Sequence, residues 1–235
     1  MTQQQPAMRS PKISTDGRVT LRLVAPNAEA VTVHNMTGGY GDWPDGNDVP
    51  MAKDEEGVWS ATIGPLASEY YAYVYVVDGV TAPDPANPFV VRMAAGYSSW
   101  LRVPGDRAAL YDINDVPHGT LHEVWYPSPS LDLTRRLFVY TPPDYEKSGG
   151  RYPVLYLLHG GGDDEEAWVT KGRTPQILDN LIAQGRVEPM IVVMPNGNAR
   201  QQAAKSTLPA LPERRISTPG GTVRLDLLRF PHILV

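Results

Sequence analysis

The residues with the clearest chemical potential are a histidine and three glycines that close an apolar run. Residues 152–162 read YPVLYLLHGGG, so a segment rich in strand-forming residues ends in His159-Gly160-Gly161-Gly162. A buried strand that ends in a glycine-rich turn can point backbone N–H groups at a developing negative charge. The pattern therefore predicts a corner that stabilises an oxyanion.

The nucleophile that such a corner would serve is not found in the sequence. No Gly-x-Ser-x-Gly turn occurs among the 235 residues. Ser217 has no predicted strand before it and no helix after it, Ser98 and Ser99 fall in a predicted strand, and His232 stands three residues from the end. Because a serine nucleophile needs a base within hydrogen-bond reach, we expect no catalytic triad and no catalytic residue in this chain.

Four acidic residues, Asp163 to Glu166, follow the glycines directly. They argue against a phosphate site, since carboxylates repel a phosphate and no G-x-x-x-x-G-K-[ST] pattern is present. A calcium site is one interpretation of the acids. A solvated loop or helix start, where carboxylates interact favourably with the helix dipole, is the interpretation that we favour.

No metal site or cofactor is expected. His118 and His122 have the spacing of zinc ligands on a helix, but Pro117 and Gly119 flank the first and the segment resembles a strand. Residues four apart in a strand are roughly 13 Å from each other, too far for one ion. The chain also has no cysteine, which excludes disulfides and thiolate ligands.

The composition limits the class of protein. Hydrophobic residues make up 42%, enough for a sizeable core, and 21 glycines with 23 prolines indicate many short strands and turns. A formal net charge of −5 does not suggest nucleic-acid binding. No apolar stretch approaches the length of a membrane span, and the polar N-terminus predicts no signal peptide.

The first half of the chain alternates apolar and polar residues, which predicts an all-β, immunoglobulin-like sandwich over residues 15–105 after a disordered lead-in at 1–14. Trp43 lies in a Gly/Asp/Pro-rich loop and Trp100 lies in the last strand. Exposed indoles could stack on sugar rings, whereas packing against their own domain is the alternative. Residues 106–118 are predicted to be a linker.

The second half predicts a strand–helix–strand unit within residues 119–199. Apolar strands are expected at 154–158 and 190–194, with a helix at 174–184 between them. Residues 200–235 diverge from this pattern: they hold six Lys/Arg and two Asp/Glu, and no amphipathic period. We expect an incomplete sheet in which 190–194 forms an apolar edge, so that this half is unstable or aggregates while the sandwich folds by itself.

Two stretches resemble known families. VTLRLVAPNAEAVTV and YYAYVYVVDGVTAPDPANP are similar to the E-set sandwich of carbohydrate-binding module family 48. RRLFVYTPPDYEKSGGRYPVLYLLHGGGDDEEAWV, continuing to MPNGN, resembles the start of the esterase D-like catalytic domain of carbohydrate esterase family 1, which includes feruloyl and acetyl-xylan esterases. The resemblance covers roughly residues 10–199 and implies a sandwich followed by a truncated α/β-hydrolase domain.

The resemblance also implies roles for the corner. Gly160 and Gly161 would offer the oxyanion N–H groups beside Gly162, His159 would orient the turn, and Trp168 would wall the pocket. The implied substrates and partners are plant cell-wall polysaccharides and their esters, with Trp43 and Trp100 as candidate sugar contacts. Neither nucleic acid nor a membrane is implied.

Four hypotheses on function stay open. The chain is an esterase relative that does not turn over esters, a carbohydrate-binding sandwich, a truncated or frame-shifted gene product, or a relative of the enterochelin esterases. Whether it is itself an enzyme is uncertain. Relatives of this kind are commonly secreted or periplasmic, while the compartment, the oligomeric state and the acyl and sugar specificity are left open.

Overall fold

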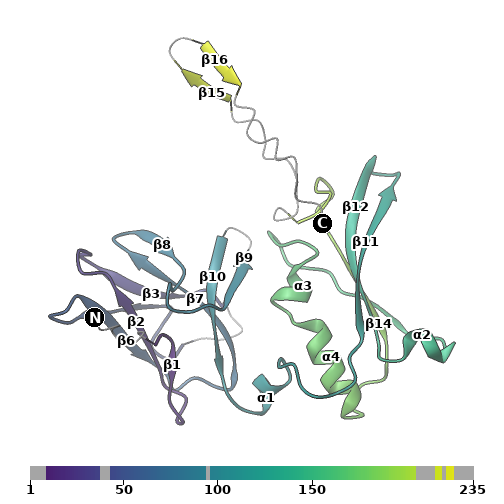
Figure 1. Ribbon diagram of the computed structural model, residues 1–235, viewed down its shortest axis with the longest axis horizontal. Coiled ribbons are helices and arrows are strands. Elements are labelled where there is room, and N and C mark those ends of the chain that lie inside the picture. Colours follow the sequence, from purple (N-terminus) through teal and green to yellow (C-terminus); the bar gives the residue numbers. More distant parts are fainter. Residues whose placement is uncertain (1–8, 38–42, 94–95, 205–214, 219–220, 225–235) are drawn as a thin grey trace, which may run out of the picture.

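The computed structural model describes residues 9–37, 43–93, 96–204, 215–218 and 221–224. Figure 1 shows two parts side by side: a β-rich part at the N-terminal end, and a second part in which helices lie on a sheet. The segment that carries α1 (Asp106–Ala109) joins them.

The N-terminal part consists of two antiparallel sheets. One has the strand order β1-β2-β6-β5 and the other β4-β3-β7-β10-β9, with β8 paired to β7. This arrangement confirms the predicted β-sandwich. The strands are Lys12–Ile13 (β1), Val19–Val24 (β2), Val31–Asn35 (β3), Asp48–Pro50 (β4), Ala52–Lys53 (β5), Val58–Ile63 (β6), Glu69–Val77 (β7), Val80–Ala82 (β8), Val90–Met93 (β9) and Gly96–Val103 (β10).

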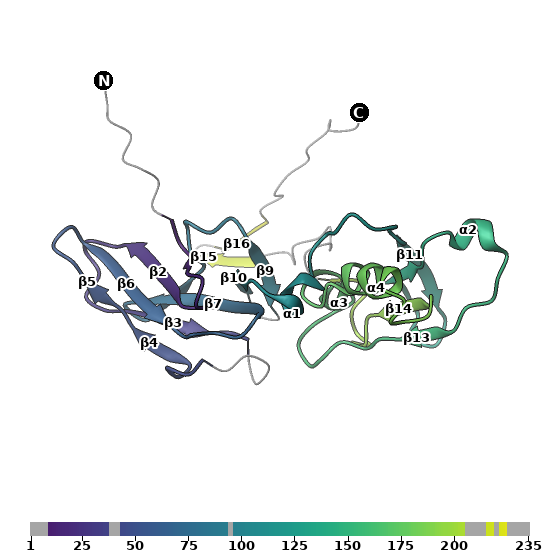
Figure 2. The same cartoon turned by 90° about the horizontal axis from the view of Figure 1, so that it is seen from below.

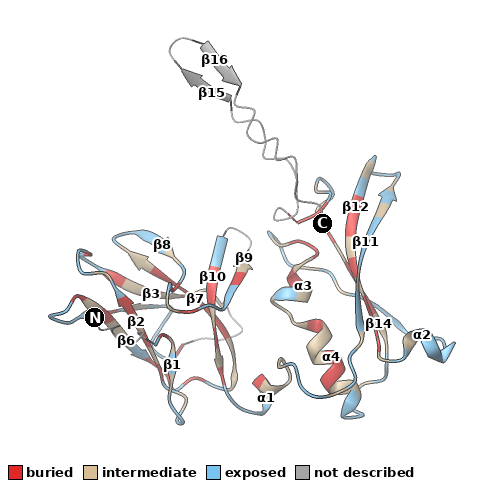
Figure 3. Cartoon of the chain, in the orientation of Figure 1, coloured by how far each residue is buried: buried red, intermediate tan, exposed pale blue. Residues whose placement is uncertain are grey.

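The core of the sandwich follows from the alternation of the sequence. Every second residue of β2 points inward, and Val19 and Leu21 are fully buried. From β7, Tyr73 and Tyr75 are fully buried in the sandwich core. Figure 3 colours the buried residues of the chain red. The hydroxyls of Tyr73 and Tyr75 donate to the buried carboxylate of Asp84, at 2.7 and 3.1 Å. Burial, together with the charge of Asp84, raises the pKa of both tyrosines.

The predicted disordered lead-in differs from the structure at its end. Residues 1–8 lie outside the described residues, but Ser10 is buried and donates to Asp84 at 2.6 Å. It also accepts from the backbone N–H of Arg22. Since β1 then pairs with β2, residues 9–13 belong to the sandwich.

The segment predicted as a linker is docked on the second part. Asn180 of α4 (Thr174–Ala183) donates from its side-chain amide to the carbonyls of Leu110 and Asp112, at 2.9 and 3.0 Å. Asp179 accepts the N–H of Gly119 at 2.9 Å. Since Asp179 and Asn180 are buried, these contacts hold the segment firmly on the helix.

A four-stranded sheet with the order β11-β12-β14-β13 forms the second part. Its strands are Thr120–Ser128 (β11), Leu133–Thr141 (β12), Val154–Tyr156 (β13) and Ile191–Pro195 (β14); its helices are Tyr145–Ser148 (α2), Ala167–Thr170 (α3) and α4. Because β13 and β14 run parallel with α4 between them in sequence, the predicted strand–helix–strand unit is confirmed. Figures 1 and 2 show α3 and α4 on the side of the sheet that faces the sandwich.

The edge of this sheet is not the strand that we predicted. Residues 190–194 do not form an edge, because β14 lies between β12 and β13. Val192 and Met194 are fully buried there. The crossover through α4 instead leaves β13 outermost, with exposed fractions of 49% for Val154, 44% for Leu155 and 68% for Tyr156.

The predicted divergent tail begins inside the fold. Arg136 of β12 donates its backbone N–H to the carbonyl of Gln202, and Ala203 and Ala204 are fully buried. Further on, Arg215–Thr218 (β15) pairs with Gly221–Arg224 (β16), which places Ser217 in a strand, whereas His232 lies outside the described residues. Across the described part of the chain, we find no helix that is long and apolar enough to cross a membrane.

Candidate active site

The glycine-rich corner lies at the carboxyl end of β13, as predicted. Leu157 still donates its N–H to Val193 of β14, and the chain then leaves the sheet at Leu158. Since β13 and β14 are parallel, their carboxyl ends lie side by side at the same end of the sheet. The corner therefore faces the turn that follows β14, which begins at Asn196.

Gly160 and Gly161 present unoccupied space and free donors. A Cβ built on either residue meets no atom within 4 Å, and neither residue has a positive φ. Among the described residues, no acceptor takes their N–H groups. Neither packing nor backbone conformation therefore requires glycine at these two positions, whereas close approach of a ligand to the backbone would. Gly162 differs, because its φ of 86° favours glycine.

His159 links the corner to the turn after β14, while the role that the resemblance implied for it stays a prediction. Its Nε2 accepts the N–H of Gly197 at 2.8 Å, so the ring proton resides on Nδ1. Nδ1 lies 2.8 Å from the carbonyl of Gly160 and donates to it. The ring thus fixes the direction of the Gly160 carbonyl and ties the corner to the turn after β14.

Trp168 anchors the end of the strand. Its indole N–H donates to the carbonyl of Leu158 at 2.8 Å, and its ring packs against the core formed around Phe138, Tyr140 and Met194. Its predicted role as a wall of a substrate pocket stays a prediction.

The acidic segment after the corner leads into α3, whose N-cap is Glu166, so it precedes a helix start as one part of our interpretation had it; the expectation that it is solvated is wrong. Asp164 is 4% exposed and Glu165 is 1% exposed. Glu165 accepts from Arg136 Nε at 2.7 Å, from Asn196 Nδ2 at 2.8 Å and from the N–H of Ala204 at 2.7 Å. The carboxylate is buried because these donors satisfy it, and the sequence alone did not point to them.

Two arginines balance these acids. Arg136 bonds Glu166 at 2.5 Å in addition to Glu165, and Arg92 of β9 bonds Asp164 at 2.5 Å and Glu166 at 3.1 Å. Burial lowers the pKa of the Arg136 guanidinium, but the hydrogen bonds that it donates to Glu166 and Glu165 outweigh burial and raise the pKa overall. The hydrogen bond that Arg92 donates to Asp164 is the main cause that raises the pKa of Arg92. Both guanidinium groups are therefore charged at neutral pH.

No cluster of three or more His, Asp or Glu side chains able to hold a metal ion occurs among the described residues. His118 pairs with Asp179 at 2.9 Å, and His122 bonds the hydroxyl of Thr141 at 2.9 Å. The two histidines therefore have separate structural partners.

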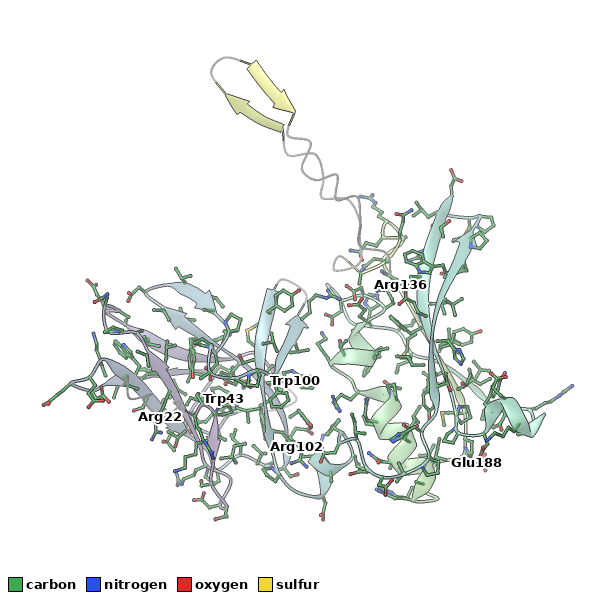
Figure 4. All side chains as sticks on the ribbon, in the orientation of Figure 1. Arg22, Trp43, Trp100, Arg102, Arg136 and Glu188 are labelled. Atoms are coloured by element: carbon green, nitrogen blue, oxygen red, sulfur yellow. The ribbon has the colours of Figure 1, made fainter. Side chains whose placement is uncertain are left out.

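The candidate sugar-binding tryptophans have different surroundings. For Trp43 the structure supports the alternative of packing against its own domain: it is 4% exposed and belongs to the sandwich core, so its faces are not open to a sugar ring. Trp100 is partly buried and packs on Tyr70, with ring centroids 5.1 Å apart. Figure 4 labels both side chains. A role for Trp100 in sugar binding stays a prediction.

No catalytic triad is assembled within the described part of the chain. No serine hydroxyl there hydrogen-bonds an imidazole, and Ser98 and Ser99 are buried in β10. The arrangement can orient a carbonyl and offer N–H donors to an anion. It contains no described group placed to attack an ester.

Comparisons with known proteins agree with the division of the chain into a sandwich and a second part. Residues 8–89 match the family "Carbohydrate-binding module 48 (Isoamylase N-terminal domain)", and residues 128–224 match the family "Putative esterase". The predicted order of module and esterase region is confirmed. The esterase match continues past residue 199, where we expected the resemblance to end, so most of the predicted divergent tail lies within it.

Two curated relatives are named as a xylanase/feruloyl esterase and a xylanase. The chain is 33% identical over 199 residues to an "Endo-1,4-beta-xylanase/feruloyl esterase" from Xylanibacter ruminicola, covering 82% of this chain and 26% of the relative. It is 36% identical over 77 residues to "Endo-1,4-beta-xylanase Y" from Acetivibrio thermocellus, covering 32% of this chain and 7% of that protein. The chain thus spans about a quarter or less of these relatives.

The crystal structure of the enterobactin esterase from Shigella flexneri in the presence of enterobactin shares the fold. Its TM-score is 0.55 at 18% identity, covering 75% of this chain and 51% of that one. At this identity the likeness concerns the fold alone. It confirms the predicted fold class, a sandwich followed by part of an α/β-hydrolase.

Proposed function

We propose that this chain, which joins a family 48 carbohydrate-binding module to an esterase-family region, serves in the hydrolysis of plant polysaccharide esters by a serine carboxylesterase mechanism. The names of the curated relatives, a xylanase/feruloyl esterase and a xylanase, support this substrate class. Plant cell-wall polysaccharide is accordingly the proposed partner.

One observation carries the proposal: the free N–H groups of Gly160 and Gly161 in open space at the carboxyl end of β13. In ester hydrolysis by this mechanism, a serine attacks the carbonyl, a histidine takes the serine proton, and the carbonyl oxygen becomes an anion. Backbone donors that are already oriented stabilise that anion without reorganising. His159 and Trp168 supply the orientation here, because each holds a carbonyl next to the glycines.

The part of the reaction assigned to this chain is oxyanion binding and not nucleophilic attack. Its 235 residues contain no Gly-x-Ser-x-Gly turn. We therefore expect the purified 235-residue protein to hydrolyse neither p-nitrophenyl acetate nor methyl ferulate above the rate of a mock preparation. Turnover well above that rate, abolished by a single serine substitution, would show that the chain holds a nucleophile that we have not identified.

The oxyanion role is tested in a chimera. Residues 1–199 are fused in frame to the portion of the Xylanibacter ruminicola relative that follows its matching segment, and methyl ferulate turnover is measured. We expect activity, and a fall of about 100-fold in kcat when Gly161→Val places a side chain where the anion must bind. Thermal unfolding of both chimeras is the control. Equal kcat values would contradict the proposed role of the corner.

A further inference from the structure

The acidic segment that follows the corner is held by arginines from both parts of the molecule. Arg136 comes from β12 of the esterase region, whereas Arg92 comes from β9 of the sandwich. Asp164 lies 72 positions after Arg92, and their bond is 2.5 Å long. The sandwich thus reaches a residue that stands three positions after Gly161.

The contacts form one connected cluster. Glu166 accepts from both arginines, at 2.5 Å from Arg136 and 3.1 Å from Arg92. The Arg92 side chain is 19% exposed and that of Asp164 is 4% exposed. Water therefore has little access to Asp164, whose carboxylate accepts from Arg92 and, at 3.2 Å, from the backbone N–H of Glu166.

Removal of Arg92 would take away one of the two arginines that bond these carboxylates. Asp164, Glu165 and Glu166 are consecutive, and like charges at this spacing repel one another when water does not screen them. Glu165 is held by three donors and cannot move without breaking them. The segment from Asp163 to Asp164 would absorb the change, since it is the end connected to the corner.

The corner is connected to this segment by short backbone links. The N–H of Asp163 donates to the carbonyl of Gly160, and the carbonyl of Asp163 accepts from Asn198 Nδ2 at 2.7 Å. Asp164 then accepts the N–H of Ala167 at the start of α3. A displacement of Asp164 therefore reorients the peptide groups on its N-terminal side.

The sandwich is also fixed in place by a second set of contacts. Arg173 Nε donates to the carbonyl of Tyr111 at 2.6 Å, and Asn180 donates to Leu110 and Asp112. These bonds hold the connecting segment on α4. They involve other residues than the arginine cluster. The position of Arg92 relative to the corner is therefore set by the docked segment as well as by its own ion pairs.

We propose that Arg92 is a positioning residue for the oxyanion corner: by holding Asp164, the sandwich fixes the direction of the Gly160 and Gly161 N–H groups. This inference rests on the function proposed above. It makes the sandwich a structural part of the esterase site, in addition to any contact that it makes with polysaccharide.

The test is an NMR spectrum of the glycine amides, recorded on the 235-residue protein. Labelling with ¹⁵N-glycine gives one amide signal for each of the 21 glycines, and single Gly→Ala variants assign Gly160, Gly161 and Gly162. In Arg92→Met we expect these three signals to move, since the charge-assisted bond that holds Asp164 is lost. Arg92→Lys keeps the charge, and we expect it to restore the signals in large part.

The matched control is Arg22→Met. Arg22 lies on β2 in the other sheet, and Figure 4 shows it on the side of the sandwich away from Arg136. We expect it to leave the three corner signals in place. If Arg92→Met does not fold, Asp164→Asn decides, because it removes the charge at constant shape.

Two results would overturn the proposal. One is a folded Arg92→Met or Asp164→Asn protein whose corner signals coincide with those of the parent. The other is a shift of all 21 glycine signals alike, which would mean general loosening. The outcome is independent of turnover: an inactive chimera with Arg92-dependent corner signals would refute the proposed function and leave the coupling intact.

Discussion

Gly160, Gly161 and Gly162 are three consecutive glycines, but their backbone conformations differ. Gly162 has a φ of 86°, which a side chain disfavours. Gly160 and Gly161 have no such φ and have open space where a Cβ would lie. The first kind of glycine stabilises the turn, while the second kind leaves room for a ligand.

This difference predicts that alanine substitutions at Gly162 and Gly161 change the free energy of unfolding by different amounts. Gly162→Ala should destabilise the protein by about 1 kcal/mol, because it forces a Cβ into the left-handed region. Gly161→Ala should change the free energy of unfolding by less than about 0.5 kcal/mol. Urea unfolding of both variants under identical conditions measures the two values. A loss at Gly161 as large as that at Gly162 would show that its glycine serves the fold.

Single residues also mark the limit of what the sequence could predict. The strand-ending glycines follow from local pattern, whereas a role for His159 was implied only by the resemblance. The partners of Asp164 and Glu165 follow from neither, because Arg92 and Arg136 are far away in sequence and only the folded chain brings them together. The surroundings of Trp43 could not be decided from the sequence for the same reason: a loop rich in Gly, Asp and Pro gives no local signal for the core that covers it.

Among the elements, the apolar runs located the strands but not their order. The runs at 154–158 and 190–194 predicted two strands, with 190–194 expected at the edge of the sheet. Which of them lies outermost depends on where the crossover through α4 returns, and no residue in either strand specifies it. The structure places β13 at the edge, with Tyr156 exposed and no charged residue between Val154 and Leu158.

An apolar edge without charges predicts self-association through β13. We expect the protein to associate as its concentration rises, and Tyr156→Lys to suppress this association while changing stability by less than about 0.5 kcal/mol. Size-exclusion chromatography with light scattering over a range of concentrations measures it. Val80→Lys is the control, since Val80 is 67% exposed on the sandwich, close to the 68% of Tyr156. Equal suppression by both lysines would exclude an effect of the edge.

At the scale of the whole molecule, two separate cores are joined by polar contacts. One core fills the sandwich, and the other lies between the sheet and the helices of the esterase region. Arg92 bonds the two parts directly, and Arg173 and Asn180 bond the segment that connects them. Both cores share one feature, a buried tyrosine whose hydroxyl donates to a buried carboxylate, which makes them respond to the same change of pH.

Alkaline pH should therefore destabilise both parts. Burial is the largest cause that raises the pKa of Tyr73, Tyr75 and Tyr140 above the ordinary value of 10.0. Above about pH 10 the unfolded chain loses these protons while the folded chain keeps them, so the free energy of unfolding falls as the pH rises. Each tyrosine contributes a slope of about 1.4 kcal/mol per pH unit in this range, and its contribution is fully present below pH 10.

Urea unfolding between pH 8 and 11.5 measures this slope, and Tyr140→Phe isolates one contribution to it. Tyr140 donates to Asp179 at 2.7 Å, so the substitution should lower stability at pH 8 by about 1 kcal/mol. The same substitution should make the decline of the free energy of unfolding with pH shallower by the contribution of one proton, because phenylalanine has no proton to lose. The two stability curves should therefore converge as the pH rises above 10. Parallel curves would mean that Tyr140 ionises as readily in the folded protein as in the unfolded chain, and its buried bond to Asp179 would then not set the response.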